Sequence, residues 1–88
     1  MKRIMRPVDM IAWFDCRGGV HPTRLRIPDE KEEGHVISVD RALERETEKF
    51  GGNPMRVFEC TGRSPEGQRR FQLKYEVKTC LWYLEKIE

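Results

Sequence analysis

The sequence has no long apolar run and no leader-like start, and each absence excludes a class of protein. Its longest apolar stretches, Met10–Phe14 and Cys80–Leu84, have the length of a strand, whereas a membrane-spanning helix needs about 20 apolar residues. The basic start MKRIMRP is not followed by an apolar segment with a small-residue cleavage site, which argues against a secretion signal. We therefore expect a cytoplasmic protein with no membrane segment.

Cysteines and histidines are few and scattered. The cysteines are Cys16, Cys60 and Cys80, and the histidines are His21 and His35; no C-x-x-C pair is present. A structural zinc site needs four such ligands, and a nucleophilic cysteine needs a base within hydrogen-bond reach. We expect no metal, no cofactor and no catalytic residue, and thus a non-enzymatic protein with reduced thiols.

Charge of one sign is not dominant either. Lys plus Arg number 17 and Asp plus Glu number 15, a net charge of +2, and the sequence pI is about 8.5, whereas nucleic-acid-binding domains often exceed a pI of about 9. The charges are nevertheless segregated. Residues 1–26 carry six basic and two acidic groups, residues 29–50 carry four and eight, and residues 51–88 carry seven and five. This charge pattern is compatible with an ordinary solvated surface of mixed charge. It is also compatible with binding to a protein partner, or with attraction of a phosphate backbone to the two basic ends of the chain.

Period-two alternation of apolar and polar residues is the main signal present. It is cleanest in residues 69–77, where Phe71, Leu73, Tyr75 and Val77 share one face. Strands are predicted over residues 8–15, 20–27, 35–40, 55–60, 69–77 and 81–87, the first beginning after Pro7 because proline disfavours helix before it. Turns are predicted at Gly18–Gly19, over the charged segment 28–34, and over 62–67.

Successive hairpins in 88 residues favour one domain over residues 1–88. We predict an all-β fold, a small SH3-like barrel of five or six antiparallel strands. Segment 41–50 stays ambiguous, because its composition favours helix while its place before the turn at 51–54 favours strand. The expected core comprises Met10, Ala12, Phe14, Leu25, Ile27, Val39, Phe58, Phe71, Leu73, Tyr75, Trp82 and Leu84.

Several segments carry a family resemblance. They are MIAWFD at 10–15, TRLRI at 23–27, LKYE at 73–76, Thr79, and LWYLEKI at 81–87. In this order they resemble a family of short β-domain proteins from anaerobic Gram-positive bacteria that has no assigned activity. The ending also resembles the last hairpin of other small β-domains, some of them encoded beside DNA-repair polymerases. The resemblance implies a fold and carries no catalytic residue or cofactor.

Two kinds of binding surface follow from the residues left outside one barrel interior. The first is an apolar strand face for a protein partner or a second copy of the chain, formed by Ile11, Trp13, Leu81 and Tyr83. The alternative is a nucleic-acid surface, because small barrels bind single strands with cations that follow phosphates and aromatics that stack on bases. Its candidate residues are Trp13, Arg24, Arg26, Arg69, Arg70, Lys74 and Tyr83.

Overall fold

The computed structural model describes residues 2–28 and 35–88. Its regular structure over these residues is all-β, as the alternation predicted. The strands are β1 (Lys2–Phe14), β2 (Val20–Ile27), β3 (His35–Glu44), β4 (Glu48–Phe50), β5 (Asn53–Ser64), β6 (Gly67–Glu76) and β7 (Leu81–Ile87).

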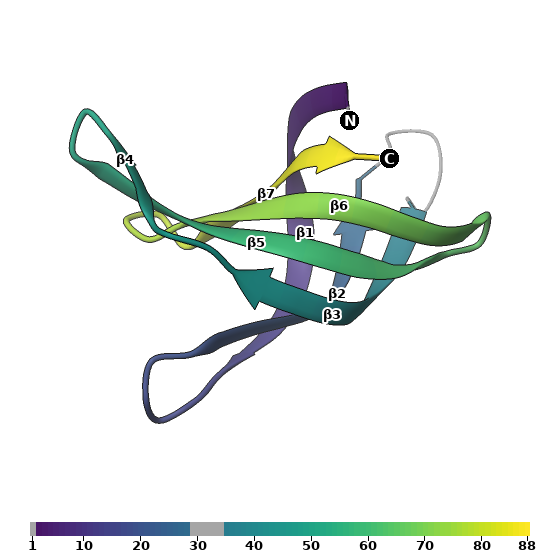
Figure 1. Cartoon of the computed structure of the whole chain (residues 1–88), viewed down its shortest axis with the longest axis horizontal. Helices are drawn as coiled ribbons and strands as arrows, with labels where there is room; N and C mark the ends of the chain where they lie inside the picture. The colour runs from purple at the N-terminus through teal and green to yellow at the C-terminus, as the bar shows by residue number, and fades with distance from the viewer. Residues whose placement is uncertain (1, 29–34) are drawn as a thin grey trace.

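The strands close into a barrel (Figure 1). Their order is β3-β2-β1-β7-β6-β5, and β3 also pairs with β5, so the ring of antiparallel partners is complete. The short strand β4 attaches to the beginning of β5 outside this ring. A closed six-stranded antiparallel barrel with one extra strand is consistent with the predicted small SH3-like fold.

Segment 41–50 contains no helix in the structure: residues 41–44 and 48–50 are strand and residues 45–47 connect them, which resolves the ambiguity left by the sequence. Strand β3 continues to Glu44, and β4 begins at Glu48. Glu44 lies opposite Phe58 in the β3–β5 ladder, and its carboxylate accepts two hydrogen bonds from Arg56, at 2.6 and 2.8 Å. Cross-strand pairing therefore outweighs the local helical preference of these residues.

Strand β1 begins at Lys2, so the prediction that it starts after Pro7 is wrong. Its first half pairs with β7, from Lys2 opposite Ile87 to Val8 opposite Trp82. An irregularity between Arg3 and Arg6, with a positive φ of 43° at Met5, adjusts the register. The charged segment expected at 28–34 lies, except for Pro28, outside the described residues.

The turn predicted at 62–67 is shorter than expected, because β5 runs through Gly62 to Ser64. Gly62 lies opposite Val39 where β3 and β5 close the barrel. A Cβ atom at this glycine would stand 2.1 Å from the carbonyl oxygen of Ser38. Only glycine allows the two backbones to approach this closely.

The interior holds most of the predicted core. Buried as expected are Leu25, Phe58, Phe71, Leu73, Tyr75, Trp82 and Leu84, while Met10, Ala12, Ile27 and Val39 are half-buried against them. Phe14 is 56% exposed, which contradicts its predicted core position. Several further residues are buried although they were not in the predicted core, namely Val20, Ile37, Met55, Val57 and Cys60.

Candidate interaction surface on the first hairpin

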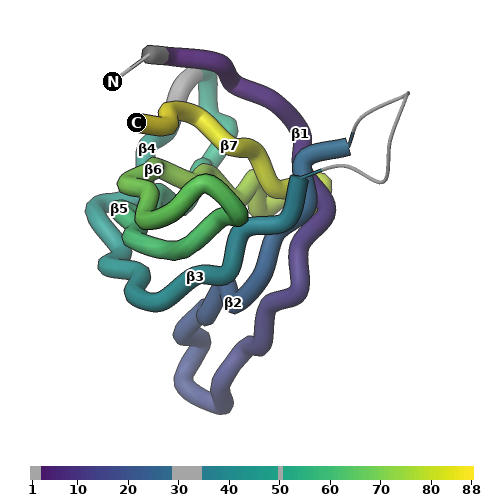
Figure 2. The backbone as a smooth tube through the Cα atoms, turned by 90° about the vertical axis from the view of Figure 1, so that its right-hand side faces the viewer, coloured from purple at the N-terminus to yellow at the C-terminus, as the bar shows by residue number. Residues whose placement is uncertain are grey.

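The hairpin of β1 and β2 projects from the barrel (Figure 2). Pairing of β1 with β7 ends at Val8, so residues 9–14 of β1 pair with β2 only. This projecting part carries three large apolar side chains within four residues: Ile11 is 63% exposed, Trp13 55% and Phe14 56%. Ile11 and Trp13 share one face of β1 and Phe14 lies on the other, so the projecting part of the hairpin exposes large apolar side chains on both faces. Neighbouring exposed side chains of this size are typical of a binding surface.

The turn of the hairpin is built around the carboxylate of Asp15. Its Oδ1 accepts hydrogen bonds from the backbone N–H groups of Arg17 at 2.8 Å and Gly19 at 2.9 Å. Its Oδ2 lies 2.7 Å from Nε2 of His21, which donates because a carboxylate only accepts. These bonds, that from His21 first, lower the pKa of Asp15 from 3.8 to about 2. A Cβ atom at Gly19 would stand 2.1 Å from Asp15 Oδ2, so the carboxylate occupies the space that a side chain would need.

His21 in turn supports Trp13. The two residues are register partners across the hairpin. Their rings are stacked, with centroids 3.9 Å apart and planes inclined by 16°. The indole is therefore held on one face by an imidazole that Asp15 fixes, while more than half of its surface stays open. The sequence marked Trp13 as a candidate, but it gave His21 no supporting role; the signal was its position opposite Trp13 across the Gly-Gly turn.

Ile11 and Arg24 extend this surface along the same two strands. They are register partners, and Thr23, the extra residue of a bulge in β2, donates its hydroxyl to the carbonyl of Ile11 at 2.8 Å. Arg24 makes no ion pair with any residue that the structure describes, whereas Arg26 bonds Asp9 at 2.6 Å. We call Ile11 and Trp13, which share this face of β1, the hairpin patch.

Phe14 and Leu81 lie on the side of the hairpin opposite Ile11 and Trp13. The ring of Phe14 meets Tyr75 edge-on at 5.8 Å. The exposed side chains of Phe14 and Leu81 line an apolar cleft of about 340 Å³ where β1 and β7 separate. The cleft lining comprises Val8, Met10, Ala12, Phe14, Tyr75, Cys80, Leu81 and Trp82. Leu81 therefore adjoins Phe14 on the face of the hairpin opposite Ile11 and Trp13.

Tyr83 lies elsewhere. It is half-buried and pairs with Pro7, six residues before Trp13 along β1, a separation of roughly 20 Å in an extended strand. It lines a different hollow, together with Met55 and Lys74. Of the four residues predicted as one interaction face, only Ile11 and Trp13 share a face of the hairpin. Leu81 lies with Phe14 at the cleft on the other face, and Tyr83 lines a different hollow.

The residues predicted for nucleic acid are not brought together as one groove. Lys74 is not a surface cation: its side chain is 9% exposed and its ammonium lies 2.9 Å from Glu48 Oε2. Arg69 and Arg70 are at the end of the barrel that holds the C-terminus, where each contacts Glu88. Within this set, Arg24 lies opposite Ile11, two residues before Trp13 on β1, and has no ion-pair partner among the described residues.

In the part of the chain that the structure covers, no three His, Cys, Asp or Glu side chains gather as metal ligands would. Residues 2–28 and 35–88 also include no helix with the length and apolarity that a membrane crossing requires. No protein-family model, curated protein or solved structure matches the chain.

Proposed function

We propose that this protein is a non-enzymatic binding module of the cytoplasm, and that its hairpin patch docks onto another protein or onto a second copy of the chain. The observation that carries the proposal is the support of Trp13: an exposed indole is stacked on His21, which Asp15 holds at 2.7 Å. Tryptophan is among the residues that contribute most to protein interfaces.

Preorganisation strengthens this interpretation. An exposed tryptophan that merely lies on a surface would lose side-chain freedom when a partner bound, at a cost of about 0.5–1.5 kcal/mol. The stack with His21 and the hydrogen bonds to Asp15 restrict the indole before binding. Ile11, two residues earlier on the same face of β1, adds exposed apolar area beside it.

The test compares Ile11→Asp and Trp13→Ala with a matched control. Leu43 is 63% exposed, as Ile11 is, but it lies on β3 away from the hairpin. We expect Ile11→Asp and Trp13→Ala to weaken association at least tenfold, and Leu43→Asp to leave it unchanged. Sedimentation over a dilution series measures self-association, and titration calorimetry measures binding to a purified partner. Equal loss of association in all three variants would contradict a role for the hairpin.

A second candidate function is contact with single-stranded nucleic acid. It is favoured by Arg24, which lies opposite Ile11 on the hairpin that exposes Trp13 and has no ion-pair partner among the described residues. The resemblance to domains encoded beside DNA-repair polymerases also favours it. Stacking of one base on an aromatic ring contributes about 1–3 kcal/mol. Retention on single-stranded DNA that falls steeply with salt, and that Arg24→Ala reduces, is the expected result; retention that is absent or insensitive to salt would exclude it.

A further inference from the structure

The projecting hairpin leaves one edge of β1 without a neighbouring strand. Residues 9–14 of β1 pair with β2 on one side, whereas β7, the neighbour on the other side, begins at Leu81 and pairs with β1 only as far as Val8. Among the residues that the structure describes, no strand pairs with this side of β1 after Val8. We call this side of residues 9–14 the open edge.

The alternation of β1 decides which main-chain groups face the open edge. In an antiparallel ladder, the N–H and C=O groups of one residue point to the same side, and those of the next residue point to the other side. The carbonyl of Ile11 points toward β2, because it accepts a hydrogen bond from the Thr23 hydroxyl at 2.8 Å. The N–H of Asp15 points the same way, because it donates to the Gly19 carbonyl at 2.9 Å. The main-chain groups that point to the open edge are therefore those of Met10, Ala12 and Phe14.

The side chains of the same three residues line the apolar cleft of about 340 Å³ between β1 and β7. Tyr75 and Leu81 are among the residues that line the cleft with them. A chain that lay along the open edge would meet unpaired N–H and C=O groups at its side and apolar side chains on one of its faces. A β-strand is the ligand that uses both, because its main chain extends the ladder while alternate side chains enter the cleft.

The other edge of the hairpin is protected against such an addition. Strand β2 pairs with β3 only from Arg24 to Ile27, so residues 20–23 also lack a second neighbour among the described strands. Pro22 has no N–H group to donate, and Thr23 is the extra residue of a bulge. Prolines and bulges are two of the devices by which edge strands avoid pairing with another chain. Residues 9–14 of β1 contain neither device, which favours the open edge as the one that accepts a strand.

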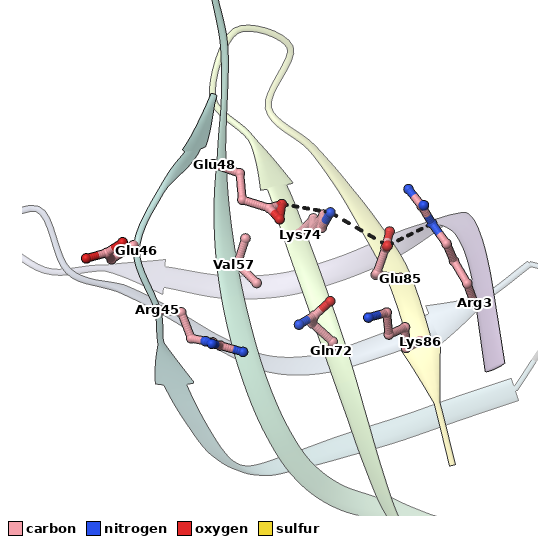
Figure 3. Close-up of a pocket in the computed structure, with 9 residues that line it drawn as sticks. All are labelled: Arg3, Arg45, Glu46, Glu48, Val57, Gln72, Lys74, Glu85 and Lys86. Carbon is pink, nitrogen blue, oxygen red and sulfur yellow. Dashed lines mark ion pairs between the residues drawn. The ribbon is translucent and has the colours of Figure 1, made fainter. Parts of the chain in front are cut away.

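A larger hollow, of about 600 Å³, lies on the outer face of β5, β6 and β7, but the charges on its floor already pair with one another (Figure 3). The ammonium of Lys74 lies 2.9 Å from Glu48 and 3.6 Å from Glu85. Glu85, the extra residue of a bulge in β7, also lies 2.9 Å from Arg3. These contacts make the floor of this hollow a network of internal ion pairs rather than a ligand site.

We infer that the open edge binds an extended segment of another protein, which adds to the sheet as a strand antiparallel to β1 and in line with β7. The segment carries apolar residues at alternate positions, because the residues that hydrogen-bond to the open edge also point their side chains into the cleft. A second copy of the chain is a poorer occupant. Its own β1, in this orientation, would run the hairpin turn at 15–19 against the turn at 77–80 that precedes β7. The inference goes beyond docking by the hairpin patch, which lies on the opposite face, and does not depend on it.

Amide hydrogen exchange in the whole chain labelled with ¹⁵N tests the open edge directly. The probe is a capped heptapeptide in which three valines alternate with two threonines, with a lysine at each end for solubility. Without the peptide, the amides of Met10, Ala12 and Phe14 should exchange at least tenfold faster than that of Trp13, which faces β2. Saturating peptide should slow the exchange of these three amides at least tenfold and leave that of Trp13 unchanged.

Methylation of the peptide's own amides provides the matched control peptides. In an antiparallel pair, the residues whose side chains enter the cleft are also those whose N–H groups point to the open edge. Methylation of the three valine amides should therefore weaken binding at least tenfold, whereas methylation of the two threonine amides should change it less than threefold. Equal binding of the two methylated peptides would contradict the proposed pairing.

Two variants test the cleft. Leu81→Asp puts a charge at the cleft on a side chain that is 49% exposed, so folding is not at risk, and it should weaken peptide binding at least fivefold. Leu43→Asp, on the exposed part of β3, should change peptide binding less than twofold. Equal binding by both variants would overturn the role of the cleft.

Two further results would overturn the proposal as a whole. One is the absence of saturable protection of the three amides by the peptide. The other is protection without peptide that rises with protein concentration, which would assign the open edge to a second copy of the chain. Absence of peptide binding would leave association through Ile11 and Trp13 unaffected, so this proposal and the proposed function fail separately.

Discussion

The imidazole of His21 lies flat against the indole of Trp13, 3.9 Å from centroid to centroid. His21 donates a hydrogen bond to Asp15, and more than half of the Trp13 surface stays exposed. This arrangement explains why a projecting hairpin can hold an exposed tryptophan in one orientation.

Removing the imidazole should loosen the indole. In His21→Ala, we expect the loss of the stacked pair to lower the free energy of unfolding by about 1 kcal/mol and to increase the rotational freedom of Trp13. Fluorescence anisotropy in a Trp82→Phe background, which leaves Trp13 as the only tryptophan, measures that freedom. His35→Ala, on the exposed start of β3, is the control and should change neither quantity.

Stability should depend on pH through Asp15. Its pKa is lowered from 3.8 to about 2 by the hydrogen bonds from His21, Gly19 and Arg17. Because the pKa is lower in the folded state, the stabilisation is fully present above pH 3.8 and is lost as the pH falls toward 2. Urea unfolding midpoints between pH 5 and pH 2 should fall less steeply in Asp15→Asn than in the wild type. Identical slopes would show that the carboxylate does not hold the turn.

The close approach of β3 and β5 should make Gly62 intolerant of a side chain. In Gly62→Ala, the new Cβ would meet the Ser38 carbonyl oxygen at 2.1 Å. Because that atom belongs to the backbone, relief requires the strands to separate, and we expect a loss of about 1–3 kcal/mol of stability. Thermal unfolding of Gly62→Ala and of the exposed neighbour Thr61→Ala measures the difference; equal midpoints would contradict this account of barrel closure.

The three cysteines should differ in reactivity. Burial raises the pKa of Cys60 to about 12, whereas Cys16 and Cys80 are exposed. Since the thiolate is the reactive form, iodoacetamide at pH 8 should label Cys16 and Cys80 in the folded protein and spare Cys60 until denaturant is added. Peptide mass spectrometry identifies the labelled sites. Rapid labelling of Cys60 in the native state would mean that the barrel interior opens readily.

Side-chain alternation along a strand depends only on the sequence, because successive Cβ atoms point to opposite faces. The sequence thus determined that Phe71, Leu73 and Tyr75 share the barrel interior, and that Gly18 and Gly19 form a hairpin turn. It also determined that Trp13 and Ile11 lie on the face opposite Met10 and Ala12, which leaves both exposed.

The tertiary structure decided what covers each face. Lys74 was predicted on the outer face of its strand and lies there, yet it is buried because β4 and the bulge of β7 bring Glu48 and Glu85 over it. Phe14 has the alternation of a core residue but is exposed, because β1 extends beyond the point where β7 can pair with it. Alternation assigns a side chain to one of two faces. Its burial depends on which distant strands reach that face, and pairing between distant strands is not encoded in any local pattern.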